Sequence, residues 1–286
     1  MARQKLGQHF LDSPAWQQRI LEKLPAAPND TWIEIGAGRG QMTRHLARKA
    51  KRLVAVEADP RLAENLRGQI AQNPADWPNV EIAEGDVLSL DIAALASTDS
   101  FRVFGNLPYY ITSPILHHLF QWADRIASIH IVIQLEVAER IIAKPGTRDR
   151  GYLSVACQYF TRPSLALKIP RGAFRPPPNV DSALIAMTLP GEKSALAISG
   201  GIPVGSSGCI RDPFLDDAAF LRFVQICFAH KRKTLRNNLL ALAPDDRVRK
   251  AINQAGLPPT IRAEQLSLTD FAVLSQRFSA GAEPEG

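Results

Sequence analysis

The feature of this chain that most restricts its fold is a series of short apolar runs, each ending in a polar or glycine-containing loop. Helix-like segments at residues 41–50 and 60–73 separate the earlier runs. Such alternation of strands and helices is typical of a parallel sheet with crossover helices. We therefore predict an α/β fold with a Rossmann-like, mostly parallel sheet. The runs are TWIEIGAGRG, RLVAVEADP, VEIAEGDVL, FRVFGNLPYY and IHIVIQLEV.

The pattern changes towards the end of the chain. Two further strands are predicted on either side of the proline-rich stretch 171–181, after which a glycine- and serine-rich segment is typical of a linker or insertion. Apolar residues at helical spacing then begin near Phe220, and Ser267 with Asp270 fits a capping box. The predicted organisation is a first domain at residues 1–190, a linker at 191–215 and a small helical domain at 216–286.

Composition excludes several classes of protein. The three cysteines lie far apart without a C-x-x-C pair, and the six histidines show no ligand spacing, so we expect neither a disulfide framework nor a metal site. No apolar run approaches the roughly 20 residues that cross a bilayer, and the first residues lack a signal peptide's apolar core. We expect a cytoplasmic monomer, and the net charge of +6 points mildly to a polyanionic partner.

The glycine loop after the first run indicates the type of ligand. Gly36, Gly38 and Gly40 form a G-x-G-x-G pattern, and Glu34 stands just before the first glycine. Tight turns between strands and helices also use glycine for structural reasons. A carboxylate beside a helix start would repel the pyrophosphate of a dinucleotide, but it would favour a ligand that carries sulfonium and ammonium groups. S-adenosylmethionine is such a ligand.

Acidic residues follow the next two predicted strands. Glu57 lies 21 positions after Gly36, near the spacing at which an acidic side chain binds a ribose diol. Asp86 could accept the amino protons of an adenine ring. Either residue alone could equally be a turn or helix-start carboxylate. Because the carboxyl ends of parallel strands line one crevice, we predict a cofactor site that includes Gly36, Gly38, Glu57 and Asp86.

The sequence NLPYY at the end of the fourth run predicts a catalytic loop. The exocyclic amine of adenine is a poor nucleophile because its lone pair is delocalised into the ring. The Asn106 side-chain oxygen and the Leu107 carbonyl could hold its two protons, and Pro108 restricts Leu107 to extended conformations. Fixed acceptors of this kind stabilise the positive charge that grows on the nitrogen as a methyl group leaves sulfur.

The aromatic residues near this loop could bind the base, which must leave its own helix to react. We predict that Tyr109 stacks on the base, an interaction typically worth about 1–3 kcal/mol. Phe174 is a candidate for the opposite face of the base. For Tyr110 we favour packing against the protein over base contact.

In these motifs the sequence resembles the ribosomal RNA adenine N6-dimethyltransferase family, and within it the bacterial small-subunit enzymes. The resemblance implies a class I methyltransferase fold, S-adenosylmethionine as donor and S-adenosylhomocysteine as product. It implies dimethylation of two adjacent adenines near the 3′ end of 16S rRNA in the immature small subunit, and cofactor contacts at His9, Leu11, Gly36, Glu57, Asp86 and Asn106. The motifs, in order from Lys5 to Leu239, are KLGQHFL, IEIGAGRG, VEADP, EGDVL, FGNLPYY, AFRPPPNVDSA and HKRKTLRNNL.

The last motif contains the densest basic patch, with Lys231, Arg232, Lys233 and Arg236. A solvated helix face is the ordinary interpretation of such a run, whereas the resemblance favours contact with rRNA phosphates. Three other functions stay open: methylation of adenine in 23S rRNA or DNA, a nicotinamide oxidoreductase, and an RNA-binding assembly factor. The glycine spacing and Glu34 disfavour the oxidoreductase, and the intact NLPY loop disfavours a factor without catalysis.

Overall fold

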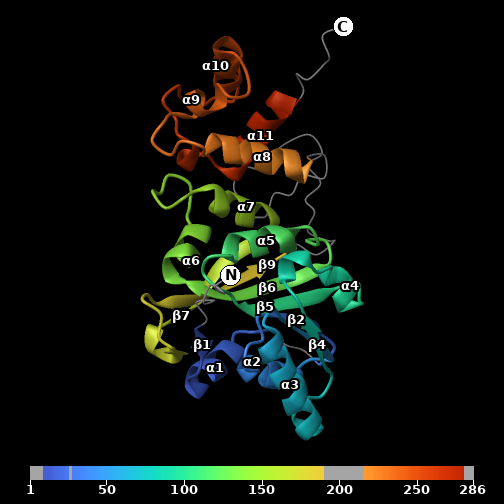
Figure 1. Ribbon diagram of the computed structural model, residues 1–286. Helices are drawn as coiled ribbons and strands as arrows, with labels where there is room; N and C mark the ends of the chain where they lie inside the picture. The colour runs from blue at the N-terminus through green and yellow to red at the C-terminus, as the bar shows by residue number, and fades with distance from the viewer. Residues whose placement is uncertain (1–8, 26–27, 190–215, 280–286) are drawn as a thin grey trace, which may run out of the picture. The chain divides into compact units, whose positions relative to one another are not determined.

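The computed structural model describes residues 9–25, 28–189 and 216–279, and the chain forms two compact units (Figure 1). The first unit contains the described residues up to Ala138 and those from Pro163 onwards to residue 189. The second contains Glu139–Arg162 and the described residues from 216 on. This division differs from the expected boundaries, because residues 139–162 pack with the later helices. The expected linker, 191–215, lies outside the described residues.

A seven-stranded sheet forms the centre of the first unit, in the order β4-β3-β2-β5-β6-β9-β7. The strands from β4 to β6 in this order pair in parallel, and β9 runs antiparallel to β6. The α/β, mostly parallel prediction is confirmed. The strands are β2 (Thr31–Ile35), β3 (Arg52–Glu57), β4 (Val80–Glu84), β5 (Phe101–Asn106), β6 (Ile126–Gln134), β7 (Arg162–Ile169) and β9 (Ser182–Thr188).

The central strands are buried on both faces because helices cover both faces of the sheet. Every residue of β2 is buried, as are the last five of β3. In Figure 1, α1, α2 and α3 lie on one side of the sheet and α5 on the other. The helices are α1 (Pro14–Leu21), α2 (Gln41–Ala47), α3 (Pro60–Gln72), α4 (Ile92–Ala96), α5 (Thr112–Phe120) and α6 (Leu135–Ile141), with 3₁₀ turns at Pro74–Asp76, Val87–Ser89 and Arg171–Ala173.

A second, two-stranded sheet joins the N-terminal segment to the proline-rich stretch. Strand β1 (Phe10–Leu11) pairs antiparallel with β8 (Phe174–Arg175), so that Leu11 lies opposite Phe174. Both of these side chains are buried in the core cluster that also contains Trp32. The pairing therefore fixes residues 9–11 beside the main sheet.

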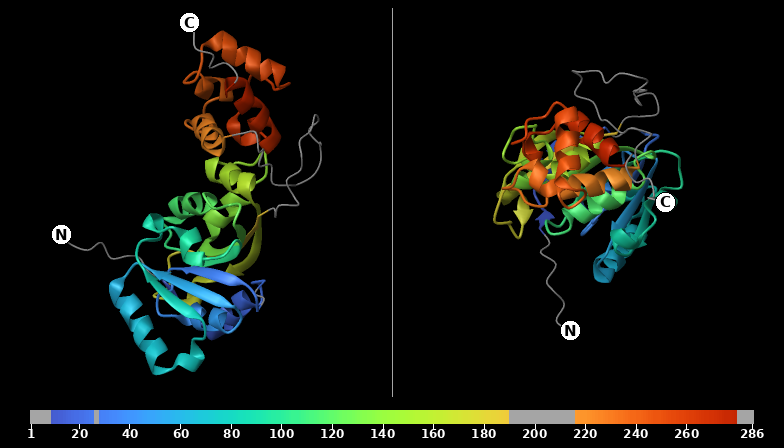
Figure 2. Two further views of the ribbon diagram at one scale, coloured as in Figure 1. Left: turned by 90° about the vertical axis from the view of Figure 1, so that its right-hand side faces the viewer. Right: turned by 90° about the horizontal axis from the view of Figure 1, so that it is seen from above.

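The second unit is helical, as the sequence predicts for its C-terminal part. The Ser267–Asp270 capping box is confirmed: the Asp270 N–H donates to Ser267 Oγ (3.1 Å) and the Ser267 N–H donates to Asp270 Oδ2 (2.8 Å). Helices α8 to α11 group together in both views of Figure 2. The elements are α7 (Tyr152–Phe160), α8 (Asp217–Cys227), α9 (Leu235–Leu239), α10 (Asp245–Gln254), α11 (Leu268–Ser279) and a 3₁₀ turn at Ala263–Gln265.

Candidate active site

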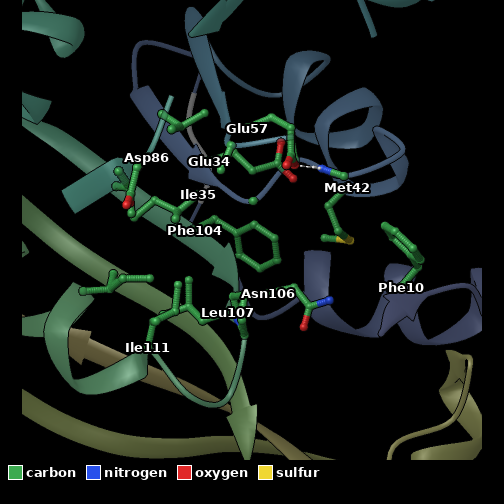
Figure 3. Close-up of a pocket in the computed structure, with 18 of the residues that line it drawn as sticks. Phe10, Glu34, Ile35, Met42, Glu57, Asp86, Phe104, Asn106, Leu107 and Ile111 are labelled. Atoms are coloured by element: carbon green, nitrogen blue, oxygen red, sulfur yellow. Dashed lines mark hydrogen bonds between the residues drawn. The ribbon is translucent and has the colours of Figure 1, made fainter. Parts of the chain in front are cut away.

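A cavity of about 290 Å³ lies within the first unit, where the loops after β2, β3, β4 and β5 meet strand β1. Figure 3 shows Glu34 and Glu57 close together on one side of this cavity, with Asn106 across from them in this view. The loops converge as expected from the rule for ligand sites in parallel sheets. Of the predicted site residues, those that line the cavity are His9, Leu11, Gly36, Gly38, Glu57, Asp86, Asn106, Leu107, Pro108 and Tyr109.

The glycine loop needs glycine at two positions for identifiable reasons. Gly40 has φ +81°, and a Cβ atom there would lie 2.6 Å from the Trp77 ring and 2.7 Å from Leu66. Gly38 has φ +61°, and its N–H donates to Glu57 Oε2 at 2.7 Å. Left-handed backbone of this kind is readily adopted only by glycine. The loop thus brings main-chain atoms to the cavity wall without side chains in the way.

Glu57 is held by two main-chain donors. Besides the Gly38 N–H on Oε2, the Asp59 N–H donates to Oε1 at 2.9 Å, and the side chain is only 4% exposed. Each carboxylate oxygen keeps a further acceptor site. The carboxylate therefore has a fixed position in the cavity wall and can still accept hydrogen bonds from a ligand's hydroxyl groups.

Asp86 lines the cavity but also has a local role. Its Oδ1 accepts a hydrogen bond from the Leu88 N–H at 3.0 Å, which caps the 3₁₀ turn Val87–Ser89. Asp86 can therefore cap the turn with one carboxylate oxygen and keep the other oxygen for a ligand in the cavity.

The structure corrects the charge expected at Glu34. The side chain is 2% exposed, and burial, with a contribution from the nearby Glu57 carboxylate and an opposing one from Thr43, raises its pKa to about 8. At neutral pH Glu34 is therefore mostly protonated in the ligand-free protein, and it does not repel a pyrophosphate by charge. Among the described residues its Oε2 atom has no hydrogen-bond partner. A cationic ligand in the cavity would lower this pKa and favour the ionised form of Glu34.

The raised pKa of Glu34 predicts a pH-dependent stability. Below pH about 4.5 both folded and unfolded chains carry the proton; between about 4.5 and 8 only the unfolded chain loses it. The free energy of unfolding should therefore fall as pH rises through this window, by up to a few kcal/mol. Glu34→Gln should lack this contribution. Urea titrations of the ligand-free proteins at pH 5, 6.5 and 8 measure the difference, and a difference that does not change with pH would contradict the assignment.

Asn106 has its side chain oriented by the N-terminal segment. Its Nδ2 donates to the His9 carbonyl at 2.9 Å. This contact fixes the orientation of the amide group and leaves its oxygen as an acceptor. The main chain of the loop is fixed on both sides of the Leu107 carbonyl. The Leu107 N–H donates to Val132 O (3.1 Å), and the Ile111 N–H donates to Pro108 O (3.2 Å).

Tyr109 is held at the cavity by two contacts. Its hydroxyl lies 3.0 Å from Ser182 Oγ, and its ring stacks on His9 with a centroid distance of 5.8 Å and an interplanar angle of 27°. The His9 Nδ1 atom in turn lies 2.8 Å from Pro176 O. His9 thus links the loop after β5 to the proline-rich stretch, a connection that sequence spacing does not reveal.

Two aromatic predictions are wrong in this structure. Phe174 is 1% exposed and packs in the core opposite Leu11, and it does not line the cavity, so it offers no face to a base. Pairing of β8 with β1 turns this side chain inward. Tyr110, interpreted from the sequence as a packing residue, lines the cavity and is 62% exposed.

The apolar wall of the cavity was not predicted from the sequence. Its side chains come from β1, α2, the loop after β4, the end of β5 and α5, and each resembles an ordinary core residue in its own segment. Only the position of Phe10 beside His9 gives a local signal. The residues include Phe10, Met42, Val87, Leu88, Phe104, Ile111 and Ile115.

The basic patch lies in the second unit and divides into two parts. Lys231, Arg232 and Lys233 are exposed in the turn between α8 and α9. Arg236 instead binds Asp245 through two hydrogen bonds, from Nε to Oδ1 (2.5 Å) and from Nη2 to Oδ2 (2.7 Å). This ion pair holds α9 to α10 and occupies two of the donor groups of Arg236, and its contact with RNA stays a prediction.

Comparison with known proteins identifies the family. The family model described as "Ribosomal RNA adenine dimethylase" matches residues 1–196, which include the whole cavity. The chain belongs to the ribosomal RNA adenine dimethylase family. It is an S-adenosylmethionine-dependent methyltransferase that dimethylates adenine in ribosomal RNA.

Relatives in this family match nearly the whole chain. "Ribosomal RNA small subunit methyltransferase A" from Acidobacterium capsulatum is 40% identical over 272 residues, covering 94% of this chain and 89% of the relative. The protein of the same name from Levilactobacillus brevis is 37% identical over 288 residues, covering 97% of this chain and 90% of the relative.

Solved structures share the fold. The 23S rRNA methyltransferase ErmE is 26% identical with a TM-score of 0.64, covering 94% of this chain and 99% of that chain. A dimethyladenosine transferase from Plasmodium falciparum has a TM-score of 0.72 at 22% identity, covering 95% of this chain and 98% of that chain. The fold of these solved structures therefore agrees with the family assigned from the sequence. Among the described residues, no helix is long and apolar enough to cross a membrane, and no cluster of metal-ligand side chains is present.

Proposed function

We propose that this enzyme transfers two methyl groups to N6 of each of two adjacent adenines near the 3′ end of 16S rRNA in the immature small subunit. The names of the similar bacterial proteins support the small subunit as substrate. The single observation that carries the chemistry is the orientation of Asn106: its NH₂ group donates to His9 O, which leaves its oxygen as an acceptor in the cavity that holds Glu57. We also propose a cytoplasmic location, because the proposed substrate is a ribosomal particle. We also propose that the active form is a monomer, which light scattering of the purified enzyme tests.

The cavity residues fit the methyl donor. Glu57 has acceptor sites for ribose hydroxyl groups, and Asp86 has an oxygen available for an adenine amino group. Gly36 and Gly38 allow close approach of the main chain, and His9 and Leu11 line the same cavity. When bound, S-adenosylmethionine supplies an electrophilic methyl group on a sulfonium. Glu34 lines the same cavity, and its buried Oε2 has no hydrogen-bond partner in the part of the chain that the structure describes.

The catalytic loop acts on the adenine amine. The Asn106 oxygen and the Leu107 carbonyl would accept its two hydrogen bonds and draw its lone pair out of conjugation. Both acceptors are held by main-chain contacts, so they need no reorganisation as positive charge develops on the nitrogen. Tyr109, fixed by Ser182 and His9, presents its remaining face to the base.

The proposal is tested with labelled S-adenosylmethionine and undermethylated 30S particles, followed by mapping of the modified nucleotides. We expect N6,N6-dimethyladenosine at two adjacent positions near the 3′ end of 16S rRNA. Modification elsewhere in the particle, or none, would contradict it.

A second candidate substrate is 23S rRNA. It is favoured by the similarity to ErmE over 94% of this chain, although the bacterial small-subunit relatives have higher identity. Free 23S rRNA, offered in parallel with 30S particles, distinguishes the two candidates by the rate of methyl incorporation.

We further propose that the exposed basic turn, Lys231 to Lys233, binds rRNA phosphates. Three exposed cations in one turn give an anion-binding surface, and this turn is held in place by Asn238. The Asn238 side chain, 4% exposed, accepts from the His230 N–H (3.2 Å) and donates to Cys227 O (2.7 Å).

The triple variant Lys231→Ala, Arg232→Ala and Lys233→Ala should weaken binding to 30S particles and lower the slope of log affinity against log salt by roughly 2 to 3. Filter binding between 50 and 200 mM KCl measures the slope. Arg236→Ala is the comparison variant. The Arg236 guanidinium is bound to Asp245, so its removal should leave the salt dependence of binding unchanged. If the triple variant kept the parental slope, the turn would not be the phosphate contact.

A further inference from the structure

Tyr110 is the most exposed large apolar or aromatic side chain among the described residues. It is 62% exposed, compared with 45% for Val180 and Leu240 and 40% for Leu242. Single exposed apolar residues are common and need no explanation by themselves. Tyr110 differs because it lines the cavity and directly follows the catalytic loop.

The two adjacent tyrosines are held very differently. The Tyr109 hydroxyl is bound to Ser182 and its ring stacks on His9, and burial raises the pKa of its phenol. For Tyr110, no side-chain hydrogen bond or ring contact exists within the part of the chain that the structure describes. Tyr109 is thus a fixed platform inside the cavity, and Tyr110 is an unoccupied aromatic face at its mouth.

A nucleobase is the ligand that this arrangement suits. When the target adenine leaves its stack to enter the cavity, the next base along the strand loses a stacking partner. Aromatic side chains bind single-stranded bases by stacking with little dependence on sequence. Consecutive Cα atoms are about 3.8 Å apart, so Tyr110 lies within a short reach of the nucleotide next to the one that Tyr109 holds.

We propose that Tyr110 is a substrate-positioning residue that stacks on the base adjacent to the target adenine. This inference rests on the proposed function. With two adjacent adenines as substrate, the same contact holds one adenine at the mouth of the cavity while its neighbour is methylated. Tyr110 therefore contributes to rRNA affinity and to the completion of both modifications, and it does not contribute to cofactor binding.

The test compares Tyr110→Ala and Tyr110→Phe with the parent enzyme on undermethylated 30S particles. We expect Tyr110→Ala to raise KM for the particle roughly tenfold and to lower the fraction of particles modified at both adenines at equal total conversion. The Kd for S-adenosylhomocysteine should stay within about twofold. Tyr110→Phe should restore both KM and the product distribution, because it keeps the ring. Val180→Ala, which removes an exposed apolar side chain away from the cavity, is the matched control.

Each other outcome overturns the inference. An unchanged KM and product distribution for Tyr110→Ala would mean that the ring touches no base. A parallel loss of S-adenosylhomocysteine affinity would make Tyr110 part of the cofactor wall. If the parent enzyme itself left 30S particles unmodified, both the proposed function and this inference would fail. If the parent were active and Tyr110→Ala had the parental KM and product distribution, only this inference would fail.

Discussion

Asn106→Ala is expected to lower the rate of methyl transfer to 30S particles by about a hundred- to a thousandfold, the range seen when one fixed polar group is removed from a transition-state site. The substitution removes the oxygen that would accept a hydrogen bond from the adenine amine. It also removes the Nδ2 contact to His9 O, which is a smaller effect because the β1–β8 pairing still holds residues 10 and 11.

Binding and catalysis should separate in this variant. The rRNA contacts proposed for the basic turn lie in the other unit, so Kd for 30S particles should change by less than about threefold. Single-turnover methylation and filter binding measure the two quantities. Asn65→Ala, which removes an exposed asparagine from α3, is the matched control and should keep full activity. Substantial transfer by Asn106→Ala would refute the proposed role of the amide oxygen.

The sequence was sufficient for the parts of the site that follow from local pattern. Gly36, Gly38, Glu57, Asp86 and Asn106 each stand at the end of a predicted parallel strand, and parallel strand ends must share one edge of the sheet. Their convergence on one cavity therefore required no knowledge of long-range contacts. The register of β3 and β4, which sets Glu57 opposite Glu84, is an observation of the structure that the sequence did not predict.

Long-range contacts decided the predictions that failed. Phe174 and Tyr110 both lie in segments that the sequence predicts as loops, and the sequence alone gives no preference for burying one and exposing the other. Pairing of β8 with β1, some 160 residues apart, buries Phe174 and sets no such constraint on Tyr110. The ion pair of Arg236 was not predicted either, since its partner Asp245 lies on the next helix. The charge of Glu34 could not be read from the sequence either, because desolvation depends on what covers the carboxyl group.

Glu57→Ala is expected to weaken binding of S-adenosylhomocysteine by at least about a hundredfold. The carboxylate is the proposed acceptor for the ribose hydroxyl groups, and charge-assisted hydrogen bonds of this kind are the stronger ones. Its loss also leaves the Gly38 and Asp59 N–H groups without their acceptor, at a cost of about 1–3 kcal/mol for each buried donor. The glycine loop should lose its fixed position together with the ribose contact.

Glu57→Gln separates these two contributions. A glutamine can accept from one of the two N–H groups, but its NH₂ group would then face the other donor, so affinity should be intermediate between the parent and Glu57→Ala. Glu84→Gln is the matched control: Glu84 lies opposite Glu57 at the end of β4, but it pairs with Arg67 at the surface and does not line the cavity. Isothermal titration with S-adenosylhomocysteine gives Kd for each variant, and thermal unfolding confirms that each is folded. A folded Glu57→Ala protein with parental affinity would show that the ribose binds elsewhere, and the cofactor orientation that aligns the methyl group with Asn106 would have to be abandoned.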